Sequence, residues 1–164
     1  MKKIVISLVV LITVCGYFLY ARHVEKTENY KNALNYLGSG IAKYELQQYE
    51  EANKDYNKAI ELNPNFAIAY YNRGNVKQDI KQYEEALNDF KKAIELAPNN
   101  ALFYNNRGLV KVNLKKYNEA IKEFDKTIEL VPNNAEPYNN RGNAKHNLKQ
   151  YEEANKDYNK AIEL

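Results

Sequence analysis

The chain has 164 residues, of which 27% are charged, and its formal net charge at pH 7 is only +3. This nearly balanced charge gives no reason to expect a polyanionic partner, and one Cys and two His exclude a disulfide framework and a zinc site built from these residues. Gly and Pro are scarce at 6 and 4, Lys, Glu, Leu and Ala are abundant, and no long β-branched alternation occurs, so we expect an all-α protein.

The first predicted element is an apolar segment at the N-terminus, residues 1–21. After Lys2 and Lys3, residues 4–21 contain no charged side chain. A helix of this length rises about 27 Å, which is enough to cross the hydrocarbon core of a bilayer. The two lysines favour a cytoplasmic N-terminus, so we expect a membrane anchor that leaves the rest of the chain outside the cytoplasm.

Two other fates of this segment stay open. Residues 14–16, Val-Cys-Gly, offer a cleavage site, and cleavage there would make the protein secreted or periplasmic. The stretch ITVC also resembles a bacterial lipoprotein signal with Cys15 as the lipidated residue, although Val14 stands where a small residue is usual. In every case residues 22–32 are expected to form a linker to the next part of the chain.

Residues 33–164 repeat with a period of 34. The stretch QYEEANKDYNKAIEL at 48–62 recurs unchanged at 150–164, an offset of 102 residues or three times 34. Such a period predicts stacked supersecondary units, here 33–66, 67–100, 101–134 and an incomplete 135–164. The step of 34 aligns Tyr36, Tyr70, Tyr104 and Tyr138; Gly40, Gly74, Gly108 and Gly142; Ala52, Ala86, Ala120 and Ala154; Tyr56, Phe90, Phe124 and Tyr158; and Pro64, Pro98 and Pro132.

Each unit predicts two helices, which we call helix A and helix B. In the second unit, helix A covers about 67–80 and helix B covers 83–96, where apolar residues recur every three or four positions. Pro98 then prevents the helix from continuing. Because Gly74 has no Cβ, it lets helix A approach a neighbouring helix closely.

These residues resemble the tetratricopeptide repeat family. Its signature W-x2-L-G-x2-Y, A-x3-F and P corresponds to Tyr70, Arg73, Gly74, Lys77, Ala86, Phe90 and Pro98. Two positions depart from it, namely Arg in place of Leu before the Gly and Lys in place of the second Tyr. The resemblance implies an α-solenoid of helix-turn-helix repeats over 33–164, following the N-terminal hydrophobic helix.

The arginines of helix A recur with an acidic residue 16 positions later in helix B. A Lys also follows each Arg by four residues. The constant offset favours an internal ladder of ion pairs, and a ladder that binds phosphate or acidic groups is the alternative. The pairs are Arg73 with Asp89, Arg107 with Glu123, and Arg141 with Asp157.

The resemblance also implies a concave groove, lined by helices A, that takes extended or helical peptides. We call the residues at the family's groove positions the inner-face positions. They are Leu34, Leu37, Ile41, Tyr44, Ile68, Tyr71, Asn75, Gln78, Leu102, Asn105, Leu109, Val112, Glu136, Asn139, Asn143 and His146. None is Lys or Arg, which argues against nucleic acid as a ligand. Their Asn side chains can donate to and accept from a peptide backbone.

The candidate peptide-binding residues combine these positions with a column of asparagines in helix A. They are Tyr71, Asn72, Asn75, Asn105, Asn106, Leu109, Asn139, Asn140 and Asn143. Some family members use basic residues here to clamp a C-terminal carboxylate. Asn75 and Asn106 match that site, but Tyr71, Glu136 and Asn140 stand where basic residues are needed, so we do not expect a carboxylate ligand.

No Ser, Cys or His grouping resembles a catalytic site, so we expect neither an enzyme nor a bound cofactor or metal. The expected function is a scaffold or adaptor that binds a peptide or protein segment and is tethered to a membrane by residues 4–21. The alternative is a structural protein that self-associates by stacking its last repeat, which has no polar capping helix, on another copy. The apolar face in question is formed by Tyr151, Ala154, Tyr158, Ala161 and Leu164.

Overall fold

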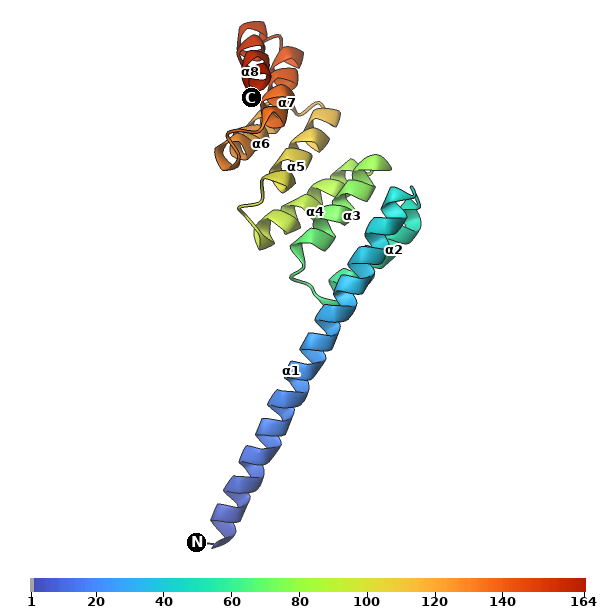
Figure 1. Ribbon diagram of the computed structural model, residues 1–164, viewed down its shortest axis with the longest axis vertical. Coiled ribbons are helices and arrows are strands. Elements are labelled where there is room, and N and C mark those ends of the chain that lie inside the picture. The colour runs from blue at the N-terminus through green and yellow to red at the C-terminus, as the bar shows by residue number, and fades with distance from the viewer. Residues whose placement is uncertain (1) are drawn as a thin grey trace.

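The computed structural model describes the backbone of residues 2–164 and the side chains of Leu19 and of residues 21–164. In this part of the chain the secondary structure consists of eight α-helices and no strand, which confirms the predicted all-α class (Figure 1). Helices A are α1, α3, α5 and α7, and helices B are α2, α4, α6 and α8. Their bounds are α1 Lys2–Glu45, α2 Tyr49–Leu62, α3 Ala67–Asp79, α4 Tyr83–Leu96, α5 Ala101–Asn113, α6 Tyr117–Leu130, α7 Ala135–Asn147 and α8 Tyr151–Glu163.

The helix pairs stack into a curved solenoid. Each helix A packs on the helix B that follows it and on the helix B that precedes it. Consecutive helices A also contact each other, whereas within residues 2–164 consecutive helices B do not. Helices A therefore lie on the inside of the curve, and the inner-face positions belong to its concave side.

Helix α1 is much longer than the others. It runs without a break over 44 residues and projects from the stack (Figure 1). Residues 22–32, the predicted linker, are thus helical and continuous with the first helix A. The predicted anchor at 4–21 lies outside the described side chains, apart from Leu19 and Ala21. Among the described residues, no helix contains a span long and apolar enough to cross a membrane.

Helix A and helix B of a repeat are joined by a tight turn around a left-handed residue. Lys115 has a φ of 58°. Its N–H donates to the carbonyl of Val112, and the N–H of Lys116 donates to the carbonyl of Lys111, both at 2.8 Å. This pair of bonds is the Schellman arrangement, which ends a helix and reverses the chain. The equivalent left-handed residues in the other repeats are Gln47, Lys81 and Lys149.

The core of each repeat is built around the glycine of helix A. A Cβ atom placed on Gly108 would lie 2.6 Å from Cε1 of the Phe124 ring, which is closer than a real Cβ can approach. Phe124 is fully buried, so the ring has little room to withdraw. The predicted close approach is confirmed, and its partner is the helix B aromatic 16 residues later. The same contact joins Gly40 to Tyr56, Gly74 to Phe90 and Gly142 to Tyr158.

The apolar face expected on the last repeat is only partly present. Tyr151 and Leu164 are exposed, and so is Ile162. Ala154, however, is buried, so its inclusion in that face was wrong. Its small side chain lies between α8 and α7, where it allows the two helices of the repeat to pack closely.

Candidate functional site

Amide side chains connect neighbouring helices A on the concave side. The Asn106 Nδ2 group of α5 donates to the Tyr71 hydroxyl at 3.1 Å and to the Asn75 Oδ1 atom at 2.8 Å, both on α3. One repeat later, Asn140 Nδ2 of α7 donates to Asn105 Oδ1 of α5 at 3.1 Å. The structure therefore brings five of the nine candidate residues together as two inter-repeat contacts.

Asn105 supports its neighbours rather than facing solvent. It is only 4% exposed, and both ends of its amide are occupied. Its Oδ1 accepts from Asn140, and its Nδ2 donates to Glu136 Oε1 at 2.8 Å. Asn105 thus fixes the Glu136 carboxylate and the Asn140 amide in position on α7.

The remaining candidate residues are separate from this network. Asn139 and Asn143 of α7 are exposed, and Asn143 Oδ1 accepts from the Tyr158 hydroxyl at 2.9 Å. Leu109 is half-buried against the core cluster of the third and fourth repeats, and Asn72 is half-buried on α3. Of these four, the two α7 asparagines are the most available to a ligand.

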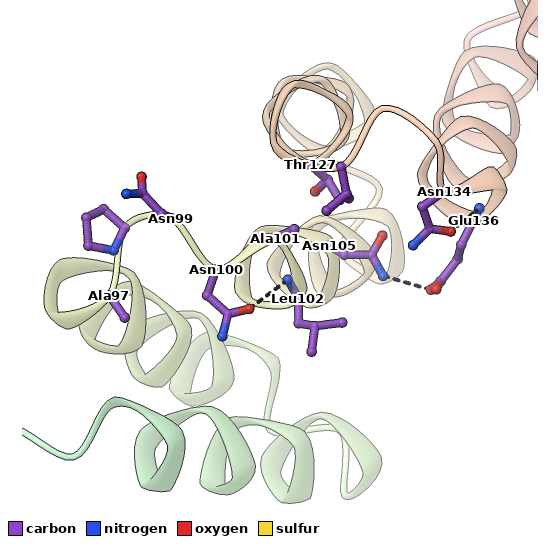
Figure 2. A pocket seen from close by; sticks show the side chains of 11 residues that line it. Ala97, Asn99, Asn100, Ala101, Leu102, Asn105, Thr127, Asn134 and Glu136 are labelled. Carbon is purple, nitrogen blue, oxygen red and sulfur yellow. Dashed lines mark hydrogen bonds between the residues drawn. The ribbon is translucent and has the colours of Figure 1, made fainter.

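A cavity of about 560 Å³ opens beside the network (Figure 2). Its walls come from the loop before α5, the first turns of α5 and α7, and the end of α6. Leu102 lies at its edge with 53% of its surface exposed. A volume of this size with a mainly apolar wall is typical of ligand sites. The lining residues are Ala97, Pro98, Asn99, Asn100, Ala101, Leu102, Asn105, Thr127, Val131, Asn134 and Glu136.

The cavity exists because small polar residues replace aromatic ones at equivalent positions. In the second repeat, Tyr71 stands where the third has Asn105, and its ring packs against Phe90 and Phe103 with centroid distances of 5.9 and 5.0 Å. Phe66 likewise packs on the first core cluster at the position that Asn100 occupies one repeat later. The loop, Thr127, Val131 and Asn134 were not predicted as lining residues. Comparing side-chain size across the repeats could have indicated them.

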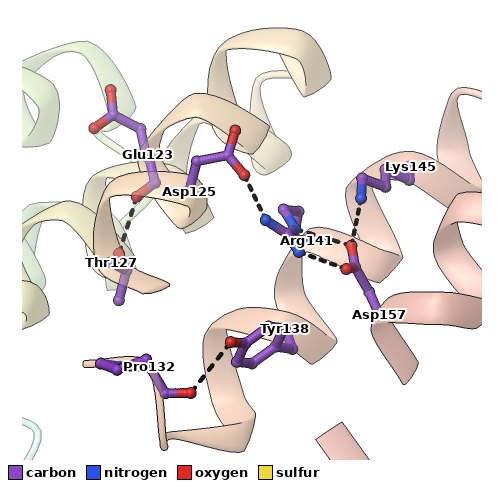
Figure 3. A network of polar contacts seen from close by, with 8 residues as sticks. All are labelled: Glu123, Asp125, Thr127, Pro132, Tyr138, Arg141, Lys145 and Asp157. Carbon is purple, nitrogen blue, oxygen red and sulfur yellow. Dashed lines mark hydrogen bonds and ion pairs between the residues drawn. The ribbon is translucent and has the colours of Figure 1, made fainter. Parts of the chain in front are cut away.

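A second network lies between helices A and B (Figure 3). Arg141 Nε and Nη2 donate to the two carboxylate oxygens of Asp157 at 2.9 and 2.6 Å, and Lys145 Nζ donates to the same carboxylate at 2.7 Å. Arg141 Nη1 reaches back to Asp125 of the preceding helix B at 2.6 Å. The arginine therefore links three consecutive helices.

The second and third repeats contain the same ion pairs, so the ladder of ion pairs predicted from the offset of 16 is confirmed. Arg73 pairs with Asp89 and Arg107 with Glu123. In the first repeat, Ser39 takes the place of the arginine and donates to Asp55 at 2.6 Å. Each carboxylate is buried and occupied by these partners, so the ladder stabilises the fold.

The charges of this ladder lower the pKa of two of its acids, Asp157 and Asp55. Burial alone would raise the pKa of the Asp157 carboxyl, but the hydrogen bonds and charges of Arg141 and Lys145 outweigh burial and hold it below its ordinary value. Asp55 shows the same balance, with Lys43 and Ser39 as partners. Hydrogen bonding to Asp157 conversely raises the pKa of Arg141.

Nothing in the described side chains groups into a metal site of three or more His, Cys, Asp or Glu residues. His146 stands at the end of α7, where its ring packs edge-on against Tyr151 with a centroid distance of 5.2 Å. This contact gives the histidine a packing role. The inner-face positions therefore offer hydrogen bonding, apolar contact and one carboxylate, that of Glu136.

Several solved structures share this architecture. MamA from Desulfovibrio magneticus RS-1 is 26% identical, with a TM-score of 0.76 over 88% of this chain and 79% of that one. The first TPR domain of Spaghetti (RPAP3), bound to the HSP90 peptide SRMEEVD, is 27% identical, with a TM-score of 0.71 over 73% of this chain and 95% of that one. The Arabidopsis OM64 TPR domain is 26% identical, with a TM-score of 0.69 over 72% of this chain and 98% of that one.

Family models describe the repeats directly. A TPR repeat model matches residues 40–80 and 111–149, and two tetratricopeptide repeat models match 67–100 with 135–164 and 90–122. No curated protein sequence matches closely enough to count as a relative. The family models together span residues 40–164 without a gap, and the chain belongs to the tetratricopeptide repeat family.

Proposed function

We propose that this protein is a non-catalytic scaffold that binds a peptide or protein segment on its concave side. Repeats of this family typically serve as protein-interaction scaffolds. The observation that carries the proposal is the cavity of about 560 Å³ next to the inter-repeat amide network. An apolar side chain of the partner enters the cavity, and exposed amides such as those of Asn139 and Asn143 bind its backbone.

The RPAP3 domain supports the peptide as ligand, because that structure contains a bound HSP90 peptide. Amides suit such a ligand, since each can donate to a carbonyl and accept from an N–H of an extended segment. The network also holds helices α3, α5 and α7 at fixed separations, which lowers the ordering cost of binding.

Photo-crosslinking from two positions tests this function. A photoreactive residue replaces exposed Leu102 at the cavity in one protein and exposed Asn88 on helix B α4 in the other. Partners captured from a cell extract should be crosslinked from position 102 and not from position 88. Equal labelling from both positions, or none from position 102, would contradict binding on the concave side.

A double substitution tests the role of the amides. Asn106→Ala with Asn140→Ala removes both inter-repeat donors, so captured partners should be lost. Asn88→Ala with Asn118→Ala changes two exposed asparagines of helices B and is the matched control. Retention of partners by the first pair would refute the contribution of the network.

We further propose that residues 4–21 anchor the protein in a membrane, with the repeats outside the cytoplasm. The support is the uncharged run of that length in the sequence. The full chain should stay in the membrane fraction after carbonate extraction, and a variant without residues 4–21 should not. The intact mass of the mature protein distinguishes the anchor from cleavage at residues 14–16 and from lipidation at Cys15.

Self-association is the second candidate function. Tyr151, Ile162 and Leu164 are 53%, 83% and 46% exposed on the last repeat, and they give a second copy an apolar surface on which to stack. Sedimentation of the full chain should then show concentration-dependent association that Ile162→Glu abolishes. A monomer at all concentrations would rule this function out and would leave the scaffold function untouched.

A further inference from the structure

The inner-face positions include one negative charge and no Lys or Arg, although the whole protein is slightly basic. The chain has 24 Lys and Arg residues against 21 Asp and Glu, yet none of the sixteen inner-face positions is Lys or Arg. Glu136 is the only acidic residue among these positions. It is also the only charged residue among the eleven that line the cavity. A partner that enters the cavity therefore meets one negative charge and no compensating cation in its wall.

The Glu136 carboxylate is held in a defined place. Its Oε1 atom accepts from Asn105, which is buried and itself fixed by Asn140 (Figure 2). Its Oε2 atom makes no hydrogen bond with any described residue. One oxygen thus orients the group, while the other can accept a hydrogen bond from a ligand.

The N-termini of the helices at the cavity do not offset the negative charge of Glu136. The first turns of α5 and α7 carry N–H groups that would attract an anion. Asn100 Oδ1, however, accepts from Leu102 N at 3.1 Å, and Asn134 Oδ1 accepts from Glu136 N at 2.9 Å. Because a side-chain cap occupies one of these donors in each helix, the Glu136 carboxylate remains the main charge beside the cavity.

Glu136 also separates two cavities. A second one, of about 470 Å³, is formed one repeat later by Ala135, Glu136, Asn139, Tyr158, Ala161 and Ile162. Both have mainly apolar walls, and in both the single charged residue is Glu136. A carboxylate between two apolar cavities matches a basic side chain that has apolar neighbours.

We propose that the bound segment is basic: it places a Lys or Arg side chain on Glu136 and an aliphatic side chain in the 560 Å³ cavity. This inference rests on the proposed function, since it names the class of segment that the concave side takes. The aliphatic group supplies apolar burial beside Leu102 and Val131, and the cation supplies discrimination against acidic segments.

Selection from a displayed library of random decapeptides on the full chain tests the inference. Peptides that combine Lys or Arg with Leu, Ile or Val should be enriched. Glu136→Gln keeps an acceptor for Asn105 and removes the charge, so it should weaken binding of the selected peptides by about threefold to tenfold. Glu136→Lys should no longer enrich basic peptides. Glu152→Lys makes the same charge change in the first turn of α8, outside the cavity, and should leave the selection unchanged.

The outcomes separate this inference from the proposed function. Enriched peptides without a basic bias, or basic peptides bound equally by Glu136→Gln and Glu136→Lys, would overturn the inference and leave a peptide-binding scaffold. If the wild-type chain enriches no peptide over a column without protein, the scaffold function fails and the inference fails with it. Circular dichroism of each variant confirms that the helices are intact.

Discussion

Alanine at Gly108 should destabilise the protein, although alanine is the better helix former. The residue lies inside α5, where a Cβ atom would meet three atoms of the Phe124 ring at 2.6, 2.9 and 3.1 Å. Gly38 provides a matched control, because it also lies inside a helix but would place its Cβ in open space. The two substitutions change the same backbone entropy, and only one of them overfills the core.

The magnitude follows from two opposing terms. Replacing Gly by Ala inside a helix stabilises it by about 1 kcal/mol, and this gain applies at both positions. Overfilling a packed core costs about 1–3 kcal/mol. Gly38→Ala should therefore raise the free energy of unfolding by about 1 kcal/mol, while Gly108→Ala should lower it by about 0–2 kcal/mol. In a chain of this size each kcal/mol shifts Tm by about 2–4 °C.

Urea unfolding followed by circular dichroism at the helix band measures both free energies. A third protein identifies the cause. With Phe124→Leu, the ring atoms that clash with the new Cβ are gone, so adding Gly108→Ala in that background should stabilise the protein as Gly38→Ala does. If Gly108→Ala stabilises the wild-type chain as much as Gly38→Ala, the close approach of α5 and α6 is not what requires glycine.

Three further results are expected from the ladder of ion pairs and from the turns. Because the folded-state pKa of Asp157 is lowered, its contribution to stability is complete above about pH 4 and is lost as pH falls through the folded pKa. Asp157→Asn should therefore flatten the fall in stability at acid pH. An unchanged fall would show that the Asp157 ion pairs do not cause it. Lys115→Gly relieves a left-handed backbone and should stabilise the protein by about 1 kcal/mol, whereas Lys122→Gly inside α6 should destabilise it by about 1 kcal/mol. Equal effects of the two substitutions in thermal unfolding would show that the left-handed conformation of Lys115 is not strained. In the neighbouring repeats, Asn57 and Asp125 of the preceding helix B each accept a hydrogen bond from Nη1 of the helix A arginine. Lys91→Asn places an acceptor at the equivalent position for Arg107 Nη1, so it should raise Tm, and a lower Tm would count against that register.

The repeat period determined most of the fold, because the contacts that define a repeat are local. Predicted helix B at 83–96 matches α4 at both ends, and predicted helix A at 67–80 extends one residue past α3. Within one repeat, the helix A glycine and the helix B aromatic residue that it contacts are 16 residues apart, and so are the arginine and the acid of the ion pair. Their spacing therefore survives in the sequence, and both the close approach of the helices and the ion pairs could be predicted from it.

Contacts between repeats were harder to predict. Arg73 also donates to Asn57 of the preceding helix B, and Asn106 donates to Asn75 of the preceding helix A, and both contacts depend on how one repeat sits on the next. The buried state of Asn105 has the same origin. A pattern inside one repeat contains no information on the angle between repeats, so the sequence identified the concave side but not the cavity.

The positions that repeat and the positions that differ have separate roles. The glycine, the aromatic residue and the buried acid recur in every repeat, so they build four similar units and cannot distinguish one ligand from another. The cavity instead depends on residues that differ between repeats at equivalent positions, as Asn105 differs from Tyr71 and Glu136 differs from Leu102. Exchanging such residues alters the concave surface while the internal ladder and the glycine contacts remain. Ligand preference in this protein should therefore follow the non-repeating positions, and Glu136, the one charge among them on the concave side, should have the largest effect.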